Sequence, residues 1–239
     1  MTDLEQQHDP YELRELRGLT ELNAVGSLER HIWGGEVTLH PELLRAMQDE
    51  GALLAGAFYQ TQLIAFVFGF PTRAASVQHS HALGILTAHQ NAGLGARLKW
   101  WQRAWCLERG IDTVRWTYDP LRLPNAKLNI HKLGATARIY LEDYYGVMPG
   151  INAGAPSDRV LAEWHLNANS VLKRLEGQPI LQPSDALEFV LPTDFAGLEG
   201  LAALEWRLKT RAFLGEHFAA GYAITGLRFE PQPAYLLSK

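Results

Sequence analysis

One stretch of the sequence constrains the fold more than any other: SVQHSHALGILTAHQNAGLGARLKWWQRAWCLERGI, residues 76–111. It begins as an apolar run rich in β-forming residues, passes through a glycine loop at 90–95, and continues with helical spacing to Gly110. A strand delivered through glycines onto a helix N-terminus presents unpaired backbone N–H groups, which favour an anion such as pyrophosphate. An ordinary strand-to-helix turn shares this pattern, so the loop by itself does not establish a site.

Two common nucleotide motifs are excluded by the loop's own residues. A dinucleotide fingerprint requires a third glycine or an alanine where this chain has Leu98. A phosphate-binding loop of the Walker type requires Gly-Lys-Ser/Thr, which the loop lacks. The anion, if one binds, is therefore held in another way.

Composition limits the class of protein and of partner. A chain of 239 residues with 47% hydrophobic residues can bury a large core. The net charge of −4 supplies no broad basic field, so we expect neither nucleic acid nor membrane as a partner. The single cysteine, Cys106, excludes an intrachain disulfide and favours a reducing compartment. The polar start and the lack of an apolar run of about 18 residues lead us to expect a cytoplasmic protein.

The rest of the first 166 residues indicates alternating helices and strands. Leu13, Leu16, Leu19, Leu22 and Val25 predict a helix over 11–33, and Pro41 opens a second helix that ends before Gly51. The further elements expected are a hairpin of strands 52–60 and 63–70, the strand and helix of the opening stretch, a strand at 111–120, a short helix at 123–135, and strands at 136–146 and 158–166.

The character of the chain changes after Asn167. A strand is predicted at 186–192, a helix at 194–220, and two terminal strands at 222–229 and 234–239. The helix carries four leucines on one side, which we expect to need a partner surface: Leu198, Leu201, Leu204 and Leu208. No repeat or low-complexity linker separates this segment. We therefore predict a domain over 1–166 and a C-terminal α/β extension over 167–239 that packs on it.

The order of elements resembles the GNAT family of acyl-CoA-dependent N-acyltransferases over residues 11–166. Its most specific parts are ILTAHQNAGLGARL, similar to the family's V-x-P-x-x-R/Q-x-x-G-x-G/A, and KLGA, similar to the end of its Y-x-K-L-G-F. The resemblance implies an α/β fold with a mixed, mostly antiparallel sheet flanked by helices. It also implies an enzyme that uses acyl-CoA as co-substrate.

The resemblance assigns the coenzyme site residue by residue. In GNAT proteins the loop amides hold the coenzyme A pyrophosphate, which here means Gln90, Asn91, Ala92, Gly93, Leu94, Gly95 and Ala96. The preceding strand pairs with the pantetheine arm, which here means Ile85, Leu86 and Thr87. The short helix at 123–135 borders the coenzyme, so Asn125 and Asn129 are candidate contacts.

The catalytic groups are less well determined. His79 and His81 lie on one face of the predicted strand, and His79 stands where some GNAT enzymes place a glutamate base. Both histidines have an ordinary structural reading as well, and two ligands at this spacing do not make a metal site, so we expect no metal. The family's tyrosine acid is replaced by Ile130. The candidate replacements, although tyrosines usually serve packing, are Tyr140, Tyr144, Tyr145, Tyr118 and His131.

The sequence thus favours transfer of an acyl group, acetyl or succinyl, to the primary amine of a small metabolite. A weaker likeness, to a little-studied GNAT branch marked by LPNAKLNIHKLGA and Tyr-Tyr-Gly, makes an amino acid one candidate acceptor and succinyl-CoA one candidate donor. Two alternatives stay open: a sensor that binds acyl-CoA without turnover, and a protein-interaction module with a structural glycine loop. The sequence also leaves a homodimer open.

Overall fold

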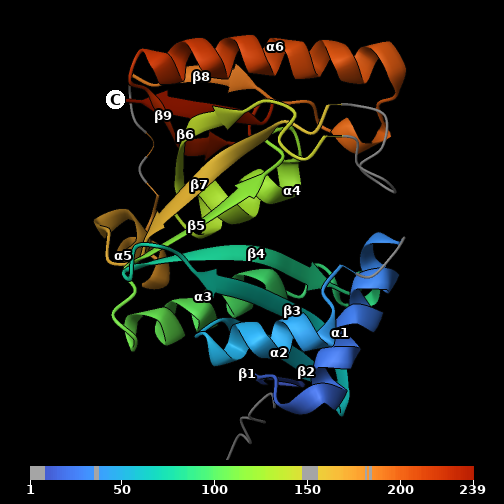
Figure 1. Ribbon diagram of the computed structural model, residues 1–239. Helices are drawn as coiled ribbons and strands as arrows, with labels where there is room; N and C mark the ends of the chain where they lie inside the picture. Colours follow the sequence, from blue (N-terminus) through green and yellow to red (C-terminus); the bar gives the residue numbers. More distant parts are fainter. Residues whose placement is uncertain (1–8, 35–37, 147–155, 181, 183–184) are drawn as a thin grey trace, which may run out of the picture. The chain divides into compact units, whose positions relative to one another are not determined.

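The computed structural model describes residues 9–34, 38–146, 156–180, 182 and 185–239 (Figure 1). Its contacts divide the chain into two compact units: Met1–Phe70 with Ala82–Gln102, and Pro71–His81 with Arg103–Lys239. This division differs from the predicted boundary at 166/167, which stays a prediction. Each unit is described separately below.

The first unit is a strand hairpin with helices packed on it. Its elements are β1 (Tyr11–Glu15), α1 (Gly18–Trp33), α2 (Pro41–Asp49), β2 (Leu53–Tyr59), β3 (Gln62–Pro71), the end of β4 (Val77–Ile85), the 3-10 turn η1 (Thr87–His89) and most of α3 (Leu94–Leu107). Strands β1, β2 and β3 pair antiparallel in that order. The predicted hairpin and second helix are confirmed. Apolar side chains of α1 and α2 form a core with the hairpin, among them Leu22, Val25, Leu28, Leu44, Leu54 and Phe66.

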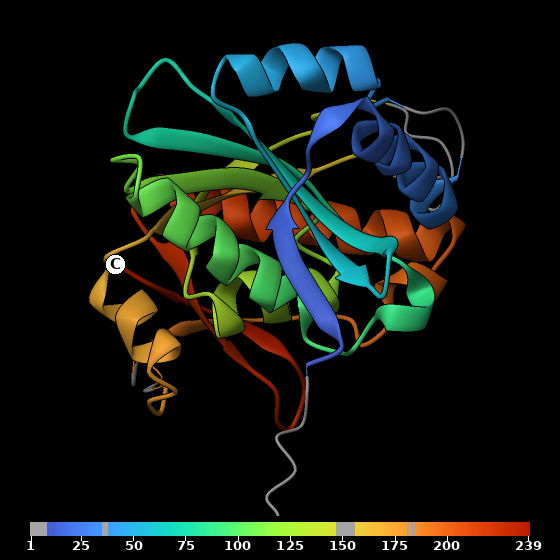
Figure 2. The same ribbon diagram turned by 90° about the horizontal axis from the view of Figure 1, so that it is seen from below.

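The predicted helix over 11–33 is wrong at its start. Residues Tyr11–Glu15 form β1, which lies along β2 with Tyr11 opposite Tyr59 (Figure 2). Helix α1 begins only at Gly18, whose φ is 72°. Pairing with β2 satisfies the backbone of this segment, and a contact of that kind overrides a helical spacing of leucines.

The second unit contains the remaining strands and the C-terminal segment. Its elements are the start of β4, β5 (Thr113–Tyr118), α4 (Leu123–Ala126), the π-helix η2 (Lys127–Lys132), β6 (Thr136–Leu141), β7 (Arg159–His165), α5 (Asn169–Leu175), β8 (Leu187–Val190), η4 (Phe195–Gly197), α6 (Gly200–Ala219), β9 (Ala223–Arg228) and β10 (Ala234–Ser238). The strand order is β4-β5-β7-β6-β9-β10-β8. The β4–β5 pair is parallel and the other pairs are antiparallel. The predicted mixed, mostly antiparallel α/β fold is confirmed.

Helix α6 packs through a face other than the one predicted from its leucine spacing. Its buried residues are Ala203, Arg207, Thr210 and Leu214. Both Nη atoms of Arg207 donate to the Asp119 carboxylate at 2.8 Å, just beyond the end of β5. The expectation that the leucine face packs on the rest of the chain is therefore wrong for Leu201, Leu204 and Leu208, which are exposed. Carboxylates at the strand ends fix the orientation of this helix instead.

Among the helices in the described part of the chain, none has the length and apolar character needed to cross a membrane.

Candidate functional site

The glycine loop of the first unit is a compact connection between β4 and α3. The Leu86 amide donates to the Ile64 carbonyl at 2.9 Å, which anchors the end of β4 on β3. The chain then makes the short 3-10 turn η1. Asn91 and Gly93 follow with φ values of 66° and 75°, and α3 begins at Leu94. Two left-handed residues within three positions turn the backbone sharply into the helix.

The start of α3 has the donors that an anion requires. Its first intrahelical hydrogen bond runs from the Arg97 amide to the Gly93 carbonyl, at 3.1 Å. The amides of Leu94, Gly95 and Ala96 therefore have no carbonyl one turn earlier in the helix. A Cβ placed on Gly93 would meet no heavy atom within 4 Å, so space is open beside it. The residues predicted to hold pyrophosphate are thus brought together in one loop with its helix N-terminus.

Two side-chain pairs beside this loop were not singled out by the sequence analysis. Arg97, in the first turn of α3, forms a two-point ion pair with Asp9, with Nη1 to Oδ1 at 3.1 Å. The Tyr11 hydroxyl lies 3.2 Å from Nδ1 of His89 in η1. One signal in the sequence could have predicted the ion pair. A cation is unfavourable at a helix N-terminus unless an anion pairs with it, and Arg97 lies in the first turn of α3.

The predicted pantetheine residues lead into the loop. Ile85 ends β4, Leu86 is bonded to β3, and Thr87 begins η1. The Gln90 amide donates to the Thr87 carbonyl at 3.2 Å, and Nε2 of Gln90 is 3.4 Å from the Ile85 carbonyl. Gln90 therefore closes the turn onto the strand end, whichever ligand the loop binds.

The two candidate base histidines lie in the second unit. Gln78 and Ser80 point into the core, and the alternation of β4 places His79 and His81 together on its other face. Their ring centres are 6.2 Å apart. In the parallel β4–β5 register, His79 is paired with Arg115 of β5. The shared face predicted for the histidines is confirmed, and their catalytic role stays a prediction.

Tyr140 belongs to a buried hydrogen-bond network. Its hydroxyl donates to Oδ2 of Asp158 at 2.7 Å, and Asp158 also accepts two hydrogen bonds from Arg211, at 3.0 and 2.8 Å. Burial raises the pKa of Tyr140, and the Asp158 carboxylate raises it further. A hydroxyl with a raised pKa is a weaker proton donor than an ordinary tyrosine.

The short helix that ends in KLGA is α4 followed by the π-helix η2. Asn125 is half-buried in α4, whereas Asn129 in η2 is only 4% exposed. Ile130, in place of the family's tyrosine, is fully buried. From α5, Nε of Arg174 donates to the His131 carbonyl at 2.7 Å. The end of this helix is thus held by a side chain that the sequence analysis missed.

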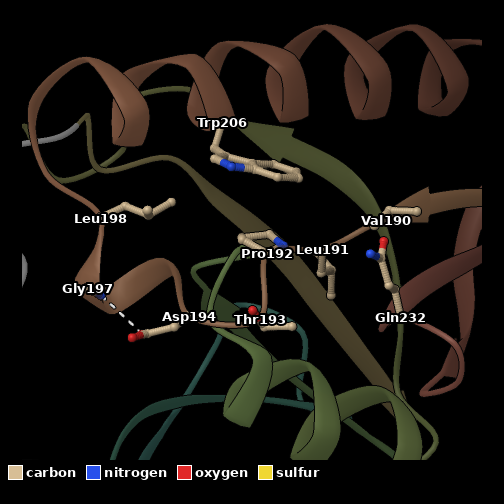
Figure 3. A pocket seen from close by; sticks show the side chains of 9 residues that line it. All are labelled: Val190, Leu191, Pro192, Thr193, Asp194, Gly197, Leu198, Trp206 and Gln232. Carbon is tan, nitrogen blue, oxygen red and sulfur yellow. Dashed lines mark hydrogen bonds between the residues drawn. The ribbon is translucent and has the colours of Figure 1, made fainter.

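Within the described ranges, no three His, Cys, Asp or Glu side chains are grouped so as to hold a metal ion. A cavity of about 520 Å³ lies between β8, η4 and α6 of the second unit, beside Trp206 (Figure 3). Its Asp194 carboxylate accepts the Gly197 amide at 3.1 Å. None of its lining residues is among those that the GNAT resemblance assigns.

Comparison with known proteins is informative for the fold. No protein-family model matches the sequence, and a search of curated proteins finds no significant match. Many solved structures match the fold. The Escherichia coli ribosomal-protein-S18-alanine N-acetyltransferase is 16% identical with a TM-score of 0.55, covering 66% of this chain and 95% of that chain.

Two further solved structures give the same result. A putative acetyltransferase of the GNAT family from Desulfovibrio desulfuricans is 15% identical with a TM-score of 0.54, covering 65% of this chain and 99% of its own. The putative acetyltransferase YncA from Salmonella typhimurium, solved with its cofactor acetyl-CoA, is 15% identical with a TM-score of 0.56, covering 67% and 96%. At these identities the likeness establishes the fold. This chain has the fold of the GNAT acetyltransferases.

Proposed function

We propose that this chain, with its GNAT fold, transfers an acyl group from acyl-CoA to the primary amine of a small metabolite. The observation that carries the proposal is the loop at 90–96. It combines two left-handed residues, open space beside Gly93 and the first free amides of α3. It also follows β4, the strand that precedes the pyrophosphate loop in the GNAT resemblance. A pyrophosphate there would accept hydrogen bonds from those amides.

The reaction requires a base and a polarised carbonyl. The amine, once deprotonated, attacks the thioester carbonyl carbon, the C–S bond breaks, and the coenzyme thiolate takes up a proton. We assign the base to the β4 histidines, with His79 first and His81 second, directly or through a water. Ile85, Leu86 and Thr87 would align the pantetheine arm, and Asn125 and Asn129 would border the coenzyme.

The donor and acceptor are part of the proposal. Acetyl-CoA and succinyl-CoA are the two donors to compare, because YncA is described with acetyl-CoA and the sequence likeness suggests succinyl-CoA. An amino acid is the first acceptor to test. We keep a cytoplasmic location within this proposal.

A sensor that binds acyl-CoA without turnover is the second candidate. Two observations favour it: Ile130 supplies no hydroxyl, and the Tyr140 hydroxyl is already bonded to Asp158. We therefore rank Tyr140 as the last of the three catalytic candidates. Binding of coenzyme A without thiol release over a panel of amines would identify the sensor.

A matched pair of glycine variants tests the loop. Gly93 and Gly110 stand before and after α3, at φ values of 75° and 73°, and neither has a heavy atom within 4 Å of an added Cβ. Gly93→Val and Gly110→Val therefore carry similar backbone strain, about 1–3 kcal/mol. We expect only Gly93→Val to weaken coenzyme A binding, by at least about tenfold, measured by titration calorimetry. Equal affinities in the two folded variants would contradict the assignment.

A second pair of variants tests the base. His79→Gln and His81→Gln preserve size and polarity and remove titration. Loss of the base should lower kcat/KM by about 10²–10⁴-fold with coenzyme binding retained, and the other substitution should cost much less. Near-full activity in both variants would remove the histidines from the mechanism and leave positioning and water to do the work.

A further inference from the structure

The outer face of α6 carries an apolar stripe that the described part of the chain leaves exposed. Leu201 is 79% exposed, Leu208 49% and Leu204 36%. Ala212, also exposed, continues the stripe one turn later. Residues three or four apart lie along one side of a helix, so these four side chains form a continuous row. Trp206, which lines the cavity of Figure 3, is on a different side of the helix.

The buried face of α6 shows that the leucine row is not needed to hold the helix in place. Arg207 and Arg211 anchor it to Asp119 and Asp158, with bidentate hydrogen bonds of 2.8 to 3.0 Å. The helix thus has one face fixed by ion pairs and another that presents leucines outward. Contiguous exposed apolar surface of this kind marks an association surface.

We propose that the α6 leucine row is the interface of a homodimer in which two copies of α6 pack antiparallel about a twofold axis. In that arrangement, the leucine row and the charged residues beside it on one copy match the same residues on the other copy in size and charge. When Leu204 of one copy lies opposite Leu208 of the other, Leu201 lies about 1.5 Å along the axis from the level of Ala212, so a large side chain meets a small one. The twofold axis repeats each of these contacts.

The same register matches charges. Glu205 and Lys209, both exposed, flank the row on one side. In the antiparallel pair, Glu205 of each copy lies about 3 Å along the axis from the level of Lys209 of the other, within reach of these long side chains, which gives two ion pairs across the interface. Opposite charges at flanking positions set partner choice and orientation in helix pairs. In a parallel twofold pair, the flank that carries Glu205 and Lys209 would face the opposite flank of the other copy, so these two charges would not meet.

The occupant that this face fits is therefore a second copy of the chain. A different protein would need a matching row of its own, whereas the α6 face already contains both the leucines and their small counterparts, and both signs of charge. The inference is independent of the acyltransferase proposal, because none of these residues belongs to the glycine loop or to the β4 histidines.

The test measures oligomeric state by sedimentation equilibrium over a concentration series of the full chain. We expect the wild type to dimerise and Leu208→Glu to raise the dimer dissociation constant by about a hundredfold or more. Because an exposed leucine is changed, circular dichroism should be unaltered. Glu205→Lys should weaken the dimer by about tenfold, since two attractive pairs become repulsive.

A mixing experiment separates the dimer from effects within one helix. Glu205→Lys alone and Lys209→Glu alone should each associate weakly, but an equal mixture should form heterodimers with the wild-type affinity. A pair within one helix cannot be restored by mixing two chains. Lys209 also lies 4.9 Å from the Trp206 ring centre, so Glu205→Lys is the cleaner single variant.

The outcomes are decisive in both directions. A wild-type dimer that Leu208→Glu dissociates and the mixture restores supports the proposal. A wild type that stays monomeric, a dimer indifferent to Leu208→Glu, or a mixture no tighter than its components would overturn it.

Discussion

Helices α3 and α6 follow different rules, although each carries a row of apolar side chains. Helix α3 buries the row that its spacing predicts, including Leu94, Leu98 and Trp105. Helix α6 exposes Leu201, Leu204 and Leu208 and buries Arg207 against Asp119. The difference shows that hydrophobic spacing identifies a helix face with apolar surface to bury. It does not identify which side of a helix faces its own core when buried carboxylates supply a competing anchor.

The largest expected effect comes from removing that anchor. Arg207→Met leaves the Asp119 carboxylate, 13% exposed, without its bidentate partner. Breaking a buried ion pair from one side costs about 3–5 kcal/mol, because the remaining charge stays desolvated. We expect a loss of this size in the free energy of unfolding from urea titrations.

Two controls make this measurement specific. Arg228 forms an equally bidentate pair with Glu188, but at the surface, so Arg228→Met should change stability little. Combining Arg207→Met with Asp119→Asn removes both charges and leaves an oxygen to accept the Leu121 amide. That double variant should recover much of the loss. If Arg207→Met costs no more than Arg228→Met, α6 is held by other contacts.

Tyr140 gives the next largest effect and separates structure from chemistry. Tyr140→Phe removes one hydrogen bond to a buried carboxylate, worth about 1.5–3 kcal/mol. We expect the melting temperature to fall while kcat for any acyl transfer that the protein performs stays nearly unchanged. A fall in kcat with unaltered melting would instead make Tyr140 the acid and reverse our ranking.

A fall in pH should destabilise α6 before it destabilises α3. Burial alone would raise the pKa of Asp158, but Arg211 and the Asp143 amide outweigh it and hold that pKa below its ordinary value. The stability that this group contributes is complete above its unfolded pKa of about 3.9 and is lost as the pH falls through the lower folded value. Helix α3 contains no Asp or Glu. As the pH falls below about 4, hydrogen exchange of backbone amides should therefore increase in α6 before it increases in α3. In the Asp158→Asn variant this acid-induced increase should be absent, because its α6 should exchange faster at all pH values.

The parts of the fold that sequence reasoning found are those specified by local signals. Gly51 and Gly110 lie just after helices, Gln60 stands in the turn of the hairpin, and the loop glycines precede α3, as predicted. These positions depend on backbone conformations that few residues adopt, so the sequence marks them directly.

The parts it missed depend on partners far along the chain. Arg207 and Asp119 are 88 residues apart, as are Arg97 and Asp9. The strand Tyr11–Glu15 exists because β2 is beside it. The spacing of residues within one segment does not predict a partner elsewhere in the chain. A row of leucines has the same spacing whether it packs on the core or on another molecule.

The smallest expected effect concerns the start of α3 and rests on the proposed coenzyme site. Asp9 neutralises Arg97 beside the loop, and a bound pyrophosphate would compete for the same guanidinium. Asp9→Asn releases Arg97 and removes a nearby negative charge, so coenzyme A should bind a few-fold more tightly at low salt and less so at high salt. Asp49→Asn, which breaks the exposed Arg45–Asp49 pair on α2, makes the same change in net charge away from the loop and should leave affinity unaltered. Calorimetric titrations of both variants decide the point. Equal affinities would mean that Arg97 serves only to tie the chain before β1 to α3, and that the loop amides alone receive the anion.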